Sequence, residues 1–96
     1  MSFNVVINRK TLAYLSVLPE KSHQLIKARC HALAEDPFPG QGGDKELLHI
    51  EFKLYRMHVG RSFTVFYQIC ERDMRVKILE ITTIDKAHKL YKHFQG

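Results

Sequence analysis

A short stretch in the second half of the chain combines basic side chains with the pattern of a β-strand. Tyr55, Met57 and Val59 alternate with Arg56 and His58. Strand side chains have a period of two, so the two basic residues share one face and the apolar residues share the other. A guanidinium and an imidazole side by side on a stiff sheet can bind an anion, and the imidazole can also transfer a proton. The alternative is a solvated strand face, the default for a half-buried antiparallel sheet.

The residues around this stretch predict a sheet that would hold it in place. Gly60 marks a turn, and residues 63–69 are rich in the β-branched and aromatic residues that strands prefer. A second turn is expected at 71–74. Residues 75–83 form the next strand, whose centre is apolar on both faces, as suits an interior strand. The second half of the chain therefore predicts a three-stranded antiparallel meander.

Helical signals dominate the first half. Residues 3–7 are a short strand candidate, and Asn8 is a suitable N-cap for a brief helix. Pro19 stands where a longer helix over 20–35 begins comfortably, which makes an αα-hairpin. The Pro- and Gly-containing stretch 36–44 is expected to be a connecting loop, because it lacks the spacing of a phosphate-binding loop.

The expected fold class is α+β, in a single domain spanning residues 1–96. The order is an N-terminal strand, an αα-hairpin, the three-stranded meander and a short C-terminal helix. That last helix is predicted over 86–94, with Asp85 as its cap.

The charge of the chain favours an anionic partner. Lys and Arg total 15 against 10 for Asp and Glu, giving a net charge of +5. Two stretches, 53–61 and 86–93, hold cations and no acid, whereas the acids gather elsewhere, among them Glu46 and Glu51. This clustering indicates a basic surface patch of the kind that nucleic acid or an acidic protein segment would contact.

No pattern in the sequence indicates a metal site, a cofactor or a membrane segment. The two cysteines, Cys30 and Cys70, lack metal-ligand spacing and are expected to be reduced and buried. The N-terminus has no clean apolar core of a signal peptide, and no run is long enough to cross a bilayer. We therefore expect a cytoplasmic protein.

The order and spacing of these pieces resemble the RelE/ParE superfamily, the toxin components of type II toxin–antitoxin modules. The resemblance covers nearly the whole chain. The stretches that carry it are Ser16–Glu20, Asp36–Pro39, Lys45–Leu47, Leu54–Gly60, Phe63–Tyr67 and Ile84–Tyr91.

The resemblance implies one of two activities. RelE-like members cut messenger RNA, usually in the ribosomal A site, and ParE-like members poison DNA gyrase. On the RelE-like interpretation the catalytic residues would be Arg56, His58, Arg61, His88 and Tyr91. The surrounding RNA backbone would be held by Lys53, Lys86, Lys89 and Lys92. Tyr91 also has the helical spacing of a core residue, and His88 could simply interact with the carbonyls at the end of the helix.

Two positions depart from the RelE-like pattern. Thr64 and Ala87 stand where that branch usually has arginines, and Arg61 could supply one of the missing charges. The first expectation is an mRNA endoribonuclease that inhibits translation at the ribosome without metal or small-molecule cofactor, and that binds a cognate antitoxin. The alternatives are a ParE-like gyrase poison and a degenerate member that only binds antitoxin or nucleic acid.

Overall fold

The computed structural model describes residues 2–40 and 42–95, and it leaves out the side chains of residue 88 and of residues 91–95. The elements in chain order are β1 (Asn4–Ile7), α1 (Arg9–Ser16), α2 (Glu20–Ala32), β2 (Lys45–His49), β3 (Leu54–Val59), β4 (Phe63–Cys70), β5 (Arg75–Thr83) and α3 (Ile84–Gln95).

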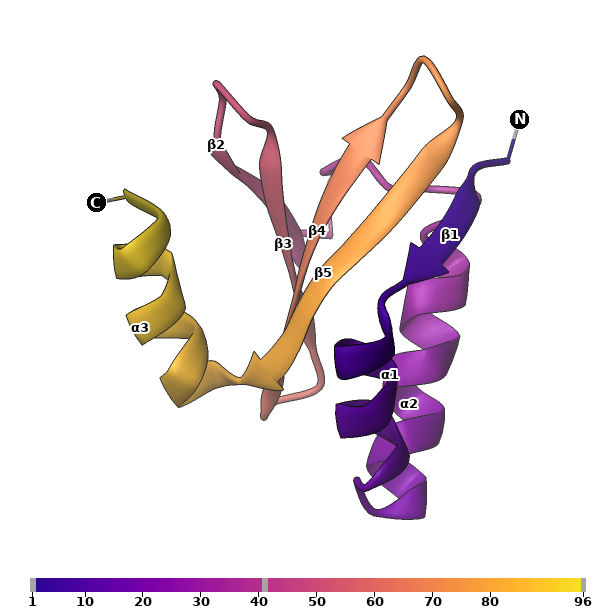
Figure 1. The fold of residues 1–96 in the computed structure, drawn as a ribbon, viewed down its shortest axis with the longest axis vertical. Helices are drawn as coiled ribbons and strands as arrows, with labels where there is room; N and C mark the ends of the chain where they lie inside the picture. Colours follow the sequence, from indigo (N-terminus) through magenta and orange to yellow (C-terminus); the bar gives the residue numbers. More distant parts are fainter. Residues whose placement is uncertain (1, 41, 96) are drawn as a thin grey trace.

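One mixed sheet organises the molecule, with the strand order β1-β5-β4-β3-β2. Strand β1 runs parallel to β5, and the other neighbours are antiparallel. Helices α1 and α2 lie on one side of the sheet and α3 lies on the other (Figure 1). The α+β class is confirmed, and the sheet extends beyond the expected meander because residues 45–49 form an additional edge strand.

The αα-hairpin begins where the sequence indicated, but α2 ends at Ala32 rather than at 35, because the N–H groups of residues 33–35 bond to carbonyls three residues earlier, as in turns. The Asn8 side chain accepts a hydrogen bond from the Thr11 N–H at 2.7 Å, which caps α1. Asn8 Nδ2 and Thr11 Oγ1 each lie 3.3 Å from the Leu79 carbonyl oxygen, so the cap also ties α1 to β5. Pro19 precedes α2 directly. The start of the hairpin is therefore fixed both by local capping and by the sheet.

The main core lies between the two N-terminal helices and the sheet. Ile26 of α2 and Leu33, the residue that caps its C-terminus, pack in one buried cluster with Met57 of β3 and Tyr67 of β4. The Tyr67 ring stacks on Tyr55 with ring centroids 5.4 Å apart. Burial of this apolar surface is the main term that stabilises a domain of this size.

A smaller core lies on the other side of the sheet. Leu54 and Phe66 are fully buried there beneath Ala87 of α3, and Leu79 and Leu90 pack against them. Helix α3 is therefore docked on the sheet by apolar contacts, on the face opposite α1 and α2.

The start of α3 differs from the expectation. The helix begins at Ile84, two residues early, and Asp85 lies inside its first turn. The Thr83 Oγ1 atom accepts a hydrogen bond from the Lys86 N–H at 3.4 Å, so the last residue of β5 has the capping position that the sequence assigned to Asp85. The Asp85 carboxylate still lies at the positive end of the helix dipole.

A buried hydrogen bond fastens the loop after α2 to the sheet. The Tyr67 hydroxyl donates to the Pro37 carbonyl at 2.7 Å, and Pro37 is fully buried. Burial, with neighbouring Tyr55, Asp44 and Asp36, raises the pKa of Tyr67, so the hydroxyl keeps its proton and remains a donor.

We expect Tyr67→Phe to destabilise the fold by about 1–3 kcal/mol, because it leaves the buried Pro37 carbonyl without a hydrogen-bond donor. Urea unfolding with an unchanged m-value would measure this loss. Tyr14→Phe is the matched control, since Tyr14 is half-buried and no hydrogen bond of its hydroxyl is found in the described part of the chain. Equal midpoints for the two variants would contradict the assignment.

Candidate functional site

The candidate site lies on the face of β3 that is turned away from α1 and α2. Tyr55, Met57 and Val59 point into the main core, so Arg56 and His58 point to the opposite face, as the period of the strand predicts. Both residues are half-buried. This face is not the fully solvated strand face that the alternation alone would allow, because α3 packs on it through Ala87.

Cross-strand pairing sets the neighbours of these two residues. His58 lies opposite Thr64, and Arg56 lies between Phe66 of β4 and Glu46 of β2. The Thr64 hydroxyl is fully buried and has no hydrogen-bond partner among the described residues. The face therefore presents a guanidinium, an imidazole and a hydroxyl on two adjacent, paired strands.

Glu46, one of the acids that lie outside the basic stretch in the sequence, lies beside Arg56 in the structure. Glu46 Oε1 forms an ion pair with Arg56 Nη2, with 49% and 19% of the two side chains exposed. The stretch 53–61 holds no acid in sequence, but β2 brings one beside it in space. A prediction of β2 as a strand paired with β3 would have found Glu46, because its register position faces Arg56.

The proposed cations do not all gather at one place. Arg61 lies on the β3–β4 turn and lines a shallow hollow with Lys21 and Ser22 of α2, on the side of the sheet opposite Arg56. Lys53 is exposed at the β2–β3 turn, and Lys86 and Lys89 are exposed on α3. The side chains proposed at His88, Tyr91 and Lys92 lie outside the described residues.

Both positions that lack the usual arginine are buried. Thr64 is fully enclosed in the sheet, and only 3% of Ala87 is exposed. Ala87 packs against Leu54 and Phe66, and its small side chain lets α3 approach the sheet closely. An arginine at position 87 would have to leave this contact or separate the two elements.

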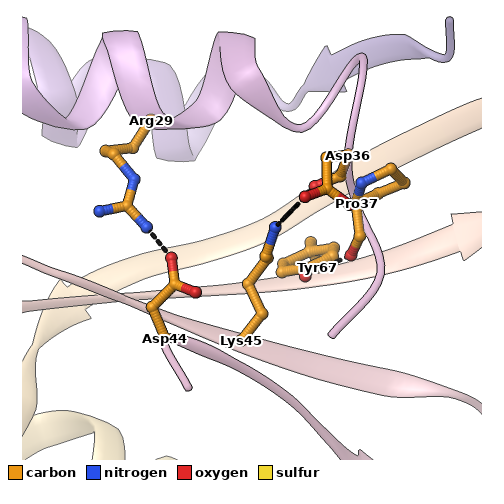
Figure 2. Close-up of polar contacts among 6 residues, drawn as sticks. All are labelled: Arg29, Asp36, Pro37, Asp44, Lys45 and Tyr67. Carbon is orange, nitrogen blue, oxygen red and sulfur yellow. Dashed lines mark hydrogen bonds and ion pairs between the residues drawn. The ribbon is translucent and has the colours of Figure 1, made fainter. Parts of the chain in front are cut away.

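Polar contacts hold the loop between α2 and β2 at both of its ends (Figure 2). Asp44 pairs with Arg29 of α2, and Lys45 Nζ lies 3.2 Å from Asp36 Oδ2. The Asp44 carbonyl accepts a hydrogen bond from the His58 N–H at 2.8 Å. The contacts at the two ends of the loop therefore fix where β2 lies against β3, and with it the position of Glu46.

Other chemistry finds little support among the described side chains. No group of three or more His, Cys, Asp or Glu residues in residues 2–40 and 42–95, where side chains are described, is placed to hold a metal ion. Burial raises the pKa of Cys30 to about 11, so its thiol stays protonated near neutral pH, and both Cys30 and the half-buried Cys70 are free. None of the described helices is both long and apolar enough to span a membrane.

The same architecture occurs in solved toxins. The fold matches RelE of the RelE–RelB complex from Pyrococcus horikoshii, with a TM-score of 0.73 and 25% identity over 86% of this chain and 96% of that one. The RelBE2 complex of Mycobacterium tuberculosis gives 0.72 and 16% identity over 86% and 99%. Isolated RelE of Escherichia coli gives 0.70 and 10% identity over 95% and 98%. These similarities define the fold of a type II toxin.

The family itself is set by a match along the sequence. The model of the ParE toxin of the type II toxin–antitoxin system parDE covers residues 7–88. The chain therefore belongs to the ParE toxin family, within the RelE/ParE superfamily of type II toxins. The comparison with curated proteins finds no match.

We expect Ala87→Arg to destabilise the fold by about 1–3 kcal/mol, because the larger side chain overfills the contact with Leu54 and Phe66. Lys89→Arg is the control, since it changes an exposed residue of the same helix. Thermal melting of both variants measures the effect. Identical melting temperatures would show that α3 has room for an arginine at position 87.

Proposed function

We propose that this toxin is a metal-independent endoribonuclease that cuts messenger RNA on the ribosome and so stops translation. The observation that supports it is that Arg56 and His58 lie side by side on one face of β3, with His58 opposite Thr64. Phosphodiester cleavage requires a group that transfers protons and a cation that stabilises the developing charge, and a rigid strand holds both in place. The RelE-like branch, to which the chain shows its structural similarity, is the branch that cuts messenger RNA.

The chemistry uses the RNA's own hydroxyl as nucleophile. A base removes the 2′-OH proton, the 2′-oxygen bonds to the adjacent phosphorus, and the bond to the 5′-oxygen breaks as that oxygen receives a proton. The products are a 2′,3′-cyclic phosphate and a 5′-OH. In this proposal His58 transfers a proton, because an imidazole nitrogen can both accept and release one. Arg56 stabilises the charge that develops on the phosphate oxygens.

The outlying residues have supporting roles in the proposal. Lys53, Lys86 and Lys89 are exposed, and with Lys92 they would contact the RNA backbone irrespective of sequence. His88 and Tyr91 remain proposed catalytic residues from α3, which packs on the correct face. Arg61 lies toward α2, so its proposed role is a phosphate contact where the RNA passes the tip of the hairpin.

A cognate antitoxin is the proposed protein partner. The RelE of Pyrococcus horikoshii and the RelBE2 toxin were both solved as toxin–antitoxin complexes. The net charge of +5 favours an acidic segment that crosses Arg56 and Lys89, with affinity that falls as salt rises. Leu47, Ile50 and Phe52 are exposed on and after β2 and would add an apolar, salt-resistant contribution. Antitoxin, ribosome and messenger RNA together imply a cytoplasmic location.

Gyrase poisoning is the second candidate, and a specific observation favours it. The matching family model is that of ParE, and the two usual arginines of the nuclease branch are replaced by the buried Thr64 and Ala87. A ParE-like toxin would act by binding, with no bond-breaking chemistry of its own. A degenerate member would keep antitoxin or nucleic-acid binding and show neither effect.

Induced expression distinguishes these candidates. We expect amino-acid incorporation to stop before DNA synthesis does, and new messenger RNA 5′ ends to accumulate. Arg56→Ala and His58→Ala should each relieve toxicity, because loss of one proton-transfer or charge-stabilising group typically lowers the rate by about 10²–10⁴. Thermal melting of each purified variant is the control: a melting temperature near that of the wild type shows that the rescue is not due to unfolding. Gyrase-dependent DNA breaks with continuing translation would establish the ParE-like activity instead.

A further inference from the structure

We infer that Glu46 is a positioning residue, which holds the Arg56 guanidinium in the orientation that receives an RNA phosphate. This inference rests on the proposed ribonuclease function and adds a residue to that site. Glu46 belongs to β2, the edge strand that the sequence did not reveal, and its register places it directly opposite Arg56.

The contact geometry leaves part of the guanidinium available. The ion pair joins Glu46 Oε1 to Arg56 Nη2. Arg56 Nε is buried and has no hydrogen-bond partner among the described residues. A guanidinium carries several N–H donors in a planar fork, so one edge can be held by a carboxylate while other donors remain for a phosphate oxygen.

The Glu46 carboxylate is better explained by its effect on the orientation of Arg56 than by a contribution to the stability of the fold. A pair in which half of the carboxylate side chain is exposed contributes little to folding. Arginine is long and flexible, and an unheld guanidinium beside a half-buried strand would sample many orientations. A fixed guanidinium is already aligned when the phosphate arrives, which is the condition for strong charge stabilisation in the transition state.

The position of β2 makes this arrangement rigid. The Asp44 side chain is held by Arg29, and the Asp44 carbonyl accepts the His58 N–H. Lys45 is held by Asp36. Glu46 follows these two anchored residues directly, so its backbone is fixed on one side by the loop contacts and on the other by pairing with Arg56.

A simple charge argument makes the opposite prediction. A carboxylate beside the phosphate site repels RNA, and its removal raises the net charge of +5 by one unit. If Glu46 acted only through its charge, Glu46→Ala would bind RNA more tightly and cleave at least as fast as the wild type. The two interpretations therefore differ in the sign of the effect.

The test compares Glu46→Ala, Glu46→Gln, Arg56→Ala and the double variant E46A/R56A in cleavage of ribosome-bound messenger RNA. Glu51→Ala is the matched control, because Glu51 is an exposed acid of the same hairpin and its removal changes the net charge equally. We expect Glu46→Ala to lower kcat by about 10–100-fold with little change in KM, as loss of alignment does. Glu46→Gln keeps an acceptor oxygen and should retain more of the activity.

The double variant identifies the route of the effect. If Glu46 acts through Arg56, E46A/R56A should be no slower than Arg56→Ala alone. If the wild type cleaves the message and Glu46→Ala is as active as Glu51→Ala, the inference is overturned and the ribonuclease function is retained.

An inactive wild type would overturn the ribonuclease function, and binding then decides the role of Glu46. Binding of a 2′-deoxy oligonucleotide of the same sequence is measured for the same variants. Positioning of Arg56 toward phosphate is supported if Glu46→Ala binds more weakly than the wild type while E46A/R56A binds as well as Arg56→Ala. Tighter binding, as the charge argument requires, would overturn it.

Discussion

The structure depends on β3 being buried on both of its faces. Tyr55, Met57 and Val59 complete the main core under α1 and α2, and Leu54 completes the smaller core under α3. Only Arg56 and His58 remain as polar side chains on this strand, and they lie on the face with α3. Half-burial of a cation carries a desolvation cost unless a partner is supplied. Glu46 supplies that partner for Arg56, which explains why the edge strand β2 matters to the site.

The elements that follow from local chemistry were predictable from the sequence. Asn8 caps α1 by its own side chain, Pro19 can start a helix, and Gly60 has a φ of 60° at the β3–β4 turn. The apolar centre of β5 indicated an interior strand, and β5 lies between β1 and β4. In each of these cases one residue type or a short period determines the structure without reference to distant parts of the chain.

The rest depended on contacts that no local pattern encodes. Strand β2 is short and has no clear alternation, and its pairing with β3 is set by the contacts at the two ends of the loop, Tyr67 with Pro37 and Arg29 with Asp44. Glu46 was therefore left outside the candidate site. Likewise, α3 packs on this face through Ala87 and Leu90, so the burial of Arg56 and His58 could not be deduced from their alternation. The chain belongs to the ParE toxin family and has the fold of RelE. The residues of this site therefore decide between gyrase poisoning and RNA cleavage.

The most direct test of the central claim is the chemistry of the ends that the protein produces. Purified toxin is incubated with ribosomes carrying a messenger RNA, and the fragments are analysed by mass spectrometry. A matched message carries a single 2′-deoxynucleotide at the cleavage site. The account predicts 2′,3′-cyclic phosphate and 5′-OH ends on the normal message and no cleavage at the substituted linkage, because the attacking group is then absent. Cleavage at the 2′-deoxy linkage, or ends that carry a 5′-phosphate, would contradict it.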